Sequence, residues 1–245
     1  IKLGLGYEDL CKIRPDIITM TIASRGMNGP ERDYLGYANI HHAIGGTSYL
    51  TGFPDDHPSH GAGGDTDIMN GATAAFAVIA ALHHHAQTGE GQFVDLSQCE
   101  GVSSLIGEYL LGYAMTGKIP ERIGNAHPRY APHSVYRCWG VDRWLALEVR
   151  SDKEFAKLAM IIGRPELAAN RRFKTMAARK RNEKALDKMI EAWTKERDRD
   201  WMVNEFCKAD LIAAPSRESR DIYADEHFRD SREGAAMRSA LQNSF

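Results

Sequence analysis

Two acidic side chains, Asp65 and Asp67, stand just ahead of an apolar, alanine-rich run of the sequence. The run, residues 71–82, predicts a helix that packs on more than one side. A carboxylate at the start of a helix can cap its free N–H groups, and it can also be a nucleophile where glycine-rich backbone lets a substrate approach. The local sequence favours the capping role and does not decide between the two carboxylates.

The same run ends in three consecutive histidines, His83, His84 and His85, followed by glycine stop signals. Consecutive helical positions point about 100° apart, so three such imidazoles cannot face one metal ion. We therefore expect a solvated helix end and no metal site. Residues 92–96, QFVDL, then predict a short buried strand.

Composition excludes several classes of function. The 245 residues suffice for one large domain or two smaller ones. The 31 Lys and Arg residues nearly balance the 33 Asp and Glu residues, so no strong overall field would recruit nucleic acid or an anionic membrane. A basic run at residues 171–184 lacks interleaved aromatic residues and is better interpreted as a solvated face.

The predicted compartment is the cytoplasm. The apolar residues 72–82 are too few to span a bilayer, and no signal peptide is visible. The cysteines have neither metal-type spacing nor the density of a secreted disulfide scaffold. They are Cys11, Cys99, Cys138 and Cys207.

The first half of the chain shows an α/β rhythm. A short helix at residues 7–13 precedes a β-branched strand at 17–22, a glycine-rich loop at 24–30 and a short helix at 36–46. Residues 96–116 predict one long helix. Its apolar face is expected at Leu105, Ile106, Tyr109 and Leu110.

A second unit is expected after the glycine and proline that end this long helix. A loop at residues 124–132 leads into a hairpin, which is followed by amphipathic helices and an apolar strand. The expected strands cover residues 134–138, 144–149 and 211–216, and the expected helices 151–162, 182–194 and 199–209. The predicted domain limits are 1–120, 121–225 and 226–245.

The central stretch resembles the class III CoA-transferases, the CaiB/BaiF family. That family has an Asp, three residues and a Gly that open a helix ending in AAL, and then a TG-x-GQ-x-VD turn and strand. The matching positions here are Asp67, Gly71, Ala80, Ala81, Leu82, Thr88, Gly89, Gly91, Gln92, Val94 and Asp95. In the family this Asp is the acyl-accepting nucleophile, so the resemblance implies that role for Asp67 rather than Asp65.

The resemblance also implies a fold. The start of the chain, LGLGYEDL, is similar to a segment that lies well inside the family's chains, so the sequence is expected to be a fragment lacking both ends of the family fold. The expected architecture is α/β: an incomplete Rossmann-like large domain carries the nucleophile, and a small α/β domain follows. Residues 226–245 would be a truncated return to the large domain, and two chains would form an interlocked homodimer.

Further site residues follow from the resemblance. The segment GNAHPRYAP resembles the family loop that covers the reacting Asp, which implies substrate binding by Gly124, Asn125, Ala126 and His127. Tyr37 is typical of the transferase branch, whereas the racemase branch has a His in a GHD motif there. A phenol is a poor base at neutral pH, which argues against racemisation.

The implied reaction moves CoA from an acyl-CoA to a carboxylic acid through an aspartyl mixed anhydride and an aspartyl-CoA thioester. It requires no metal or organic cofactor beyond CoA, which enters as the acyl-CoA substrate. Two alternatives remain open. One is an α-methylacyl-CoA racemase of the same family, and the other is a non-catalytic remnant or interaction subunit. Some transferases carry a Glu where this chain has Ala38, so a second polar partner is missing from the pattern.

Overall fold

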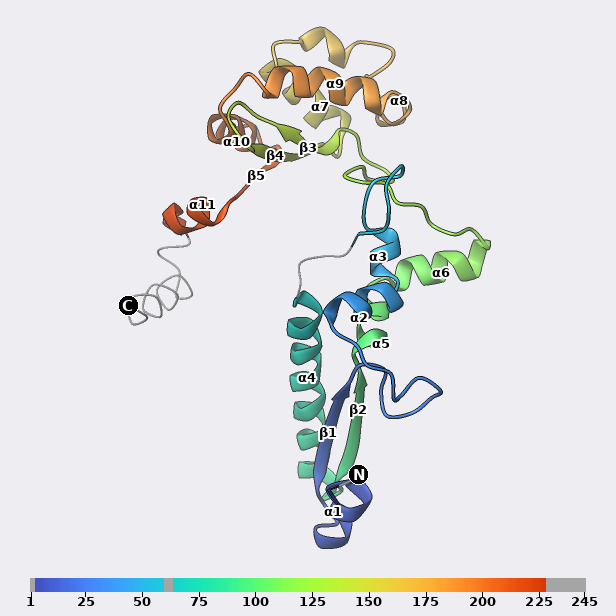
Figure 1. Ribbon diagram of the computed structural model, residues 1–245. Helices are drawn as coiled ribbons and strands as arrows, with labels where there is room; N and C mark the ends of the chain where they lie inside the picture. The colour runs from blue at the N-terminus through green and yellow to red at the C-terminus, as the bar shows by residue number, and fades with distance from the viewer. Residues whose placement is uncertain (1–2, 60–63, 228–245) are drawn as a thin grey trace. The chain divides into compact units, whose positions relative to one another are not determined.

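The structure is a computed structural model that describes residues 3–59 and 64–227 (Figure 1). The chain divides into two compact units, Ile1–Gly124 and Asn125–Phe245. The predicted limit at residue 120 lies in the same connection between the last helix of the first unit and the first strand of the second. Of the predicted return segment, residues 226–245, all but the first two positions lie outside the described residues.

The first unit is built on two parallel strands, β1 (Ile18–Ala23) and β2 (Gln92–Ser97). Ile18 pairs with Gln92 at one end of the ladder and Ala23 with Ser97 at the other. Parallel strands need a crossover connection, which here contains the helices α2 (Ala38–Ile44), α3 (Thr47–Leu50) and α4 (Asp65–Thr88). The long helix α4 packs along both strands, as Figure 1 shows, and the α/β prediction is confirmed.

The local signals at the start of the chain predicted its structure well. The helix α1 (Tyr7–Ile13) has the expected bounds, and the Tyr7 ring stacks on Phe93 of β2 with ring centroids 5.7 Å apart. The expected strand at 17–22 is β1, shifted by one residue, and the short helix at 36–46 is α2. These elements depend on local breaks at glycine and proline, which the sequence displays directly.

Two helix predictions were wrong. The helix α4 begins at Asp65, well before the expected residue 71, so both acidic residues lie inside its first turn. The expected helix at 96–116 is not continuous, because β2 extends to Ser97 and is followed by two helices, α5 (Gln98–Ser104) and α6 (Gly107–Thr116). The Ser97 hydroxyl accepts a hydrogen bond from the Glu100 N–H and caps α5.

The apolar face expected on the long helix is also corrected. Leu105 closes α5 as its C-cap, and Ile106 stands at the N-cap of α6, so the two residues interrupt the helix. The side chains of Leu105, Tyr109 and Leu110 are exposed in the single chain.

The second unit is a three-stranded antiparallel sheet in the order β3-β4-β5, covered by helices. Its strands are β3 (His133–Arg137), β4 (Trp144–Glu148) and β5 (Ile212–Ser216). Its helices are α7 (Asp152–Ile161), the 3-10 helix η1 (Pro165–Ala168), α8 (Met176–Arg181), α9 (Glu183–Thr194), α10 (Arg199–Lys208) and α11 (Ser219–Ala224). The helix α9 packs on β3, and α10 packs on β4 and β5. The predicted hairpin, helices and last strand are confirmed with small shifts of their bounds.

The two units differ in their hydrophobic cores. Among the described residues, one contiguous cluster of buried apolar side chains lies in the second unit, with Phe155, Leu186 and Phe206 at most 1% exposed. In the described part of the first unit, few apolar side chains are buried: Ala74, Ala81, Leu96, Cys99 and Val102. No helix in the described part of the chain is long and apolar enough to cross a membrane.

Candidate active site

The first turn of α4 carries both candidate carboxylates. Gly64 occupies the N-cap position with a φ of 93°, a left-handed conformation that glycine adopts without strain, and no side chain caps the helix. Asp65 and Asp67 therefore lie in the first turn, where the helix dipole favours negative charge, and neither is the N-cap residue. Neither carboxylate therefore acts from the N-cap position, which is the role that the local sequence favoured.

Asp65 is occupied by contacts within the protein. Its Oδ1 accepts hydrogen bonds from His42 Nε2 at 2.8 Å and from the Thr66 N–H at 2.8 Å. The hydrogen bond from His42 lowers the pKa of the Asp65 carboxyl below its ordinary value. Asp65 thus joins the start of α4 to α2.

Asp67 differs from Asp65 in its contacts. Its side chain is exposed, and it has no hydrogen-bond or ion-pair partner among residues 3–59 and 64–227. Its neighbours Thr66 and Asn70 point inward and are buried, at 2% and 1% exposure. The turn therefore presents one carboxylate that is held by a histidine and a second that is available to a substrate.

A buried histidine, His41, lies in the same unit as Asp67. His41 is 1% exposed, and its Nε2 lies 3.1 Å from Ser24 Oγ, just beyond the end of β1. Burial lowers the pKa of His41 below its ordinary value, the Asp67 charge raises it and the Arg25 charge lowers it. The charges of Asp67 and Arg25 therefore act on the His41 imidazole in opposite directions.

The packing around His41 requires a glycine nearby. A Cβ added at Gly36 would lie 2.1 Å from Ser24 Oγ and 3.1 Å from His41 Nε2. The sequence analysis singled out neither His41 nor His42. The available signal was a pair of adjacent histidines inside a short helix between glycines, GYANIHHAIGG.

Tyr37, expected to bind substrate, is the N-cap residue of α2. Its side chain is 84% exposed, and its carbonyl accepts a hydrogen bond from the His41 N–H at 3.0 Å. No contact in the described part of the chain joins its phenol to Asp67. The backbone of Tyr37 is therefore tied to His41, whereas its side chain is open to solvent.

The loop that follows the first unit is anchored by side chains. Gly124, the last residue of the first unit, has a φ of 58°, and a Cβ there would lie 2.5 Å from the Phe53 ring. The Asn125 carbonyl accepts a hydrogen bond from His133 Nδ1 at 2.8 Å, and the His127 carbonyl accepts one from Lys180 Nζ at 2.7 Å. These contacts fix the carbonyl side of the loop.

The His127 ring organises the rest of this loop. Its Nδ1 accepts hydrogen bonds from the N–H groups of Arg129 at 3.0 Å and Tyr130 at 3.2 Å. Burial lowers the pKa of His127, which agrees with a neutral ring whose Nδ1 is an acceptor. The backbone N–H groups of residues 125–127 have no acceptor among the described residues, so they are available to a ligand.

The three histidines at the end of α4 contact different partners. His83 Nε2 lies 3.1 Å from Gln87, His84 Nε2 lies 3.4 Å from Glu90, and His85 Nε2 lies 3.6 Å from Asp16. Within residues 3–59 and 64–227, no group of three His, Cys, Asp or Glu side chains could hold a metal ion.

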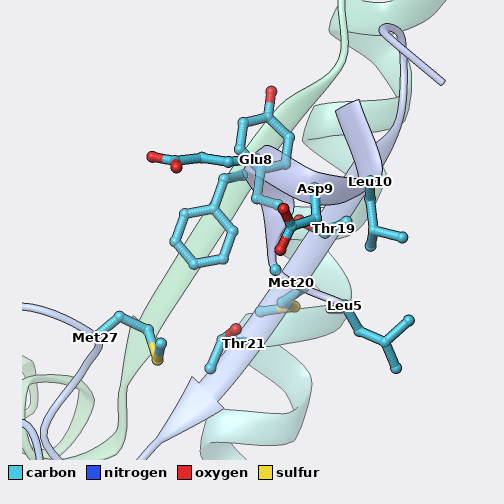
Figure 2. Close-up of a pocket in the computed structure, with 11 residues that line it drawn as sticks. Leu5, Glu8, Asp9, Leu10, Thr19, Met20, Thr21 and Met27 are labelled. Carbon is cyan, nitrogen blue, oxygen red and sulfur yellow. The ribbon is translucent and has the colours of Figure 1, made fainter. Parts of the chain in front are cut away.

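A pocket of about 580 Å³ lies elsewhere in the first unit, between α1 and the two strands (Figure 2). Its lining includes Glu8, Asp9, Thr21 and Met27, and it contains no Lys, Arg or His. Two carboxylates without a cation are a poor environment for the phosphates of CoA. None of the predicted site residues lines this pocket.

Comparisons with known proteins place the chain in a family. The model of the CoA-transferase family III matches residues 1–242. The chain belongs to this family. A CaiB/BaiF family protein from Brucella suis has the same fold with a TM-score of 0.85 at 34% identity, over 93% of this chain and 60% of that one.

Two curated members of the family show the extent of the similarity. The succinyl-CoA–D-citramalate CoA-transferase of Chloroflexus aurantiacus is 34% identical over 225 residues, which cover 92% of this chain and 56% of the relative. The acetyl-CoA:oxalate CoA-transferase of Acetobacter aceti is 34% identical over 203 residues, 82% of this chain and 52% of the relative. The chain thus spans little more than half the length of the curated relatives it matches.

The effect of the Asp67 charge on His41 can be measured by NMR titration of the His41 imidazole. We expect its pKa to lie below the ordinary value of 6.5 and to fall further in Asp67→Asn, because that change removes a negative charge that favours the imidazolium. Asp55→Asn, which alters a charge that does not act on His41, is the matched control. An unchanged or raised His41 pKa in Asp67→Asn would contradict this effect of the Asp67 charge.

Proposed function

We propose that this chain carries the nucleophile of a CoA-transferase, which moves CoA from an acyl-CoA to a carboxylic acid. The observation that carries the proposal is the exposed carboxylate of Asp67 in the first turn of α4, which no other described residue holds, beside an Asp65 that His42 already holds. The family match and the named CoA-transferases among the relatives support this reaction class.

The relatives suggest which substrates to test first. Several are named for a succinyl-CoA donor, and the acids in their names are D-citramalate, L-malate and mesaconate. All of these are dicarboxylic acids. We therefore propose succinyl-CoA as the first donor to examine and a small dicarboxylic acid as the acceptor.

In the first half of the proposed reaction, an Asp67 carboxylate oxygen attacks the thioester carbonyl carbon of the donor. A C–O bond forms, the C–S bond breaks, and CoA leaves as the thiolate with the electron pair. The thiolate then attacks the aspartyl carbonyl carbon of the mixed anhydride. The donor acid leaves as a carboxylate with the bridging oxygen, and an aspartyl-CoA thioester remains on the chain.

In the second half, the acceptor carboxylate attacks the aspartyl carbonyl carbon and expels the CoA thiolate. This gives a second mixed anhydride, and the thiolate attacks its acceptor carbonyl carbon to form the new acyl-CoA. Asp67 is released as a carboxylate that has gained one oxygen from the acceptor. Acyl transfer between a carboxylate and a thiolate changes no oxidation state, so CoA can enter as a substrate without a further cofactor.

We also propose that the substrate is bound by Tyr37, Gly124, Asn125, Ala126 and His127. The support for this binding role is the open N–H side of residues 125–127, which could donate hydrogen bonds to a developing oxyanion. The exposed phenol of Tyr37 stands where a racemase would need a base, which favours transfer over racemisation. We also propose a cytoplasmic location, which the four free cysteines support.

The decisive test of the nucleophile is isotope exchange. A panel of acyl-CoAs, beginning with succinyl-CoA, is incubated with the matching ¹³C-labelled acid, and label in the acyl-CoA is followed by mass spectrometry. Exchange needs only the first half of the reaction and its reversal, so the acceptor need not be known. We expect Asp67→Asn to lose more than about 10³-fold in exchange rate, because an amide cannot form the anhydride.

Asp65→Asn is the matched control for this test. Its amide oxygen can still accept hydrogen bonds from His42 and from the Thr66 N–H, so we expect a loss of less than about tenfold. The reverse ranking of the two variants would mean that Asp65 is the nucleophile. Absence of exchange by the wild-type chain with every pair would overturn the CoA-transferase proposal.

A second experiment separates transfer from racemisation. With an ¹⁸O-labelled acceptor acid, we expect label in the Asp67 carboxylate, because its oxygens pass through the anhydride. A 2-methylacyl-CoA incubated in heavy water should gain no deuterium at Cα. Deuterium at Cα without any CoA exchange would support the racemase instead, and neither signal would favour a non-catalytic remnant.

A homodimer with interlocked chains is the last part of the proposal. Large apolar side chains are exposed on both long helices of the first unit, and a partner chain could cover them. They include Ile68, Phe76 and Ile79 of α4 and Leu110, Leu111 and Met115 of α6. We expect light scattering to give the mass of a dimer at micromolar concentration, and a well-behaved monomer would contradict this.

A further inference from the structure

A continuous series of hydrogen bonds runs from α3 through α2 to the first turn of α4. Thr47 Oγ1 lies 2.8 Å from His42 Nδ1, and His42 Nε2 lies 2.8 Å from Asp65 Oδ1. Asp65 Oδ1 also accepts the hydrogen bond from the Thr66 N–H. Both ring nitrogens of His42 are therefore engaged, and the series ends two residues before Asp67.

The burial of His42 makes this arrangement specific. The residue is 6% exposed, so an imidazole nitrogen without a partner would lose its hydrogen bond to water with no compensation. The two contacts on opposite sides of the ring also fix its orientation. An exposed histidine could rotate away from Asp65, whereas His42 has its ring held at both nitrogens.

The His42–Asp65 contact lies at a helix start whose N-cap residue makes no side-chain capping bond. Gly64 at the N-cap position has no side chain, and the Ser, Thr, Asp or Asn that normally fixes the first turn is missing there. Asp65, the first residue of α4, instead accepts hydrogen bonds from the Thr66 N–H and from His42 of α2. The His42–Asp65 hydrogen bond lies two residues before Asp67, whose carboxylate must reach the substrate in the proposed reaction.

The first two turns of α4 also pack against α5 on another side of the helix. Asn70 Nδ2 donates to the Gln98 carbonyl at 3.3 Å, and Asn70 Oδ1 lies so close to Gly101 that a Cβ there would be 2.0 Å away. Thr66 is buried on this side as well. The start of α4 is thus held at Asp65 on one side and at Thr66 and Asn70 on another, with Asp67 facing outward.

We propose that His42 is a positioning residue for the Asp67 nucleophile, which acts by holding Asp65 and with it the first turn of α4. The proposal rests on the CoA-transfer function proposed above. Asp67 has no side-chain partner of its own among the described residues, so the backbone of this turn sets where its carboxylate lies. A misplacement of about 1 Å can cost on the order of 10²-fold in the rate of a covalent step.

The test measures ¹³C exchange between the active acyl-CoA and its acid, with succinyl-CoA and succinate as the first pair. We expect His42→Leu to lower kcat by about 10- to 100-fold while KM stays within about twofold, since substrate contacts are kept. His42→Gln should recover most of the rate, because its amide Nε2 can still donate to Asp65. The matched control is His83→Leu at the exposed end of α4, which should exchange like the wild type.

A double-mutant cycle separates positioning from general loss of stability. If His42 acts through Asp65, then His42→Leu should lower kcat no further in a chain that already carries Asp65→Ala. Independent structural damage would instead multiply the two losses. Thr47→Val, which removes only the hydroxyl that contacts His42, should give a smaller loss of kcat if the Leu variant fails to fold.

Different results of these experiments would overturn the positioning role of His42 and the CoA-transfer function on which that role rests. Wild-type exchange with unchanged kcat in the His42 variants, or multiplying losses in the double variant, would overturn the positioning role alone. No exchange by the wild-type chain with any pair would overturn the proposed function and this inference together. A loss in KM alone, with kcat preserved, would assign His42 to substrate binding and also overturn the proposal.

Discussion

The parallel pairing of β1 with β2 is the constraint on which the first unit depends. Two parallel strands cannot be joined by a tight turn, so the chain must return along the sheet before it can form the second strand. The crossover consequently brings α2 and the start of α4 back to the edge where both strands end. Ser24, just beyond β1, and α5, just beyond β2, meet them there. The candidate site lies where open α/β sheets usually bind ligands.

At this edge of the sheet, side chains of the same type differ in their partners. His41 and His42 are adjacent on one short helix, yet one faces Ser24 and the other faces Asp65. Asp65 and Asp67 are two residues apart on one turn, yet Asp65 is bound to His42 whereas Asp67 has no side-chain partner in the described part of the chain. Because helical neighbours point about 100° apart, each residue of such a pair meets a different environment. A short stretch of chain can therefore supply both a structural and a reactive carboxylate.

The sequence predicted the helices and strands whose bounds are set by nearby residues. The Tyr7–Ile13 helix and the hairpin of the second unit follow from local breaks and apolar periodicity. The expected single helix at 96–116 failed because Leu96 and Ser97 pair with Ile22 and Ala23 of β1, a contact distant in sequence. Helix and strand propensities over a short stretch of sequence contain no information about pairing with a distant strand. Tertiary contacts of this kind override those propensities.

The sequence likewise predicted some residues of the candidate site but not the contacts that hold them. Spacing to Gly71 and the family pattern pointed to Asp67, but no local rule could show that Asp65 is bound to a histidine 23 positions earlier. The anchoring of the 124–132 loop by His133 and Lys180 is equally a product of the folded second unit. Such contacts require the chain to be folded before they can be recognised.

The unequal cores of the two units have a consequence for the ligand. The second unit buries a contiguous apolar cluster, whereas the described part of the first unit, which contains the proposed nucleophile, buries few apolar side chains. Opening of a thinly packed unit costs less free energy than opening of a well-packed one. A molecule that binds only the closed form shifts this equilibrium by mass action. Under the proposed function, an acyl-CoA bound to the first unit would stabilise the closed form of that unit and so protect it from proteolysis.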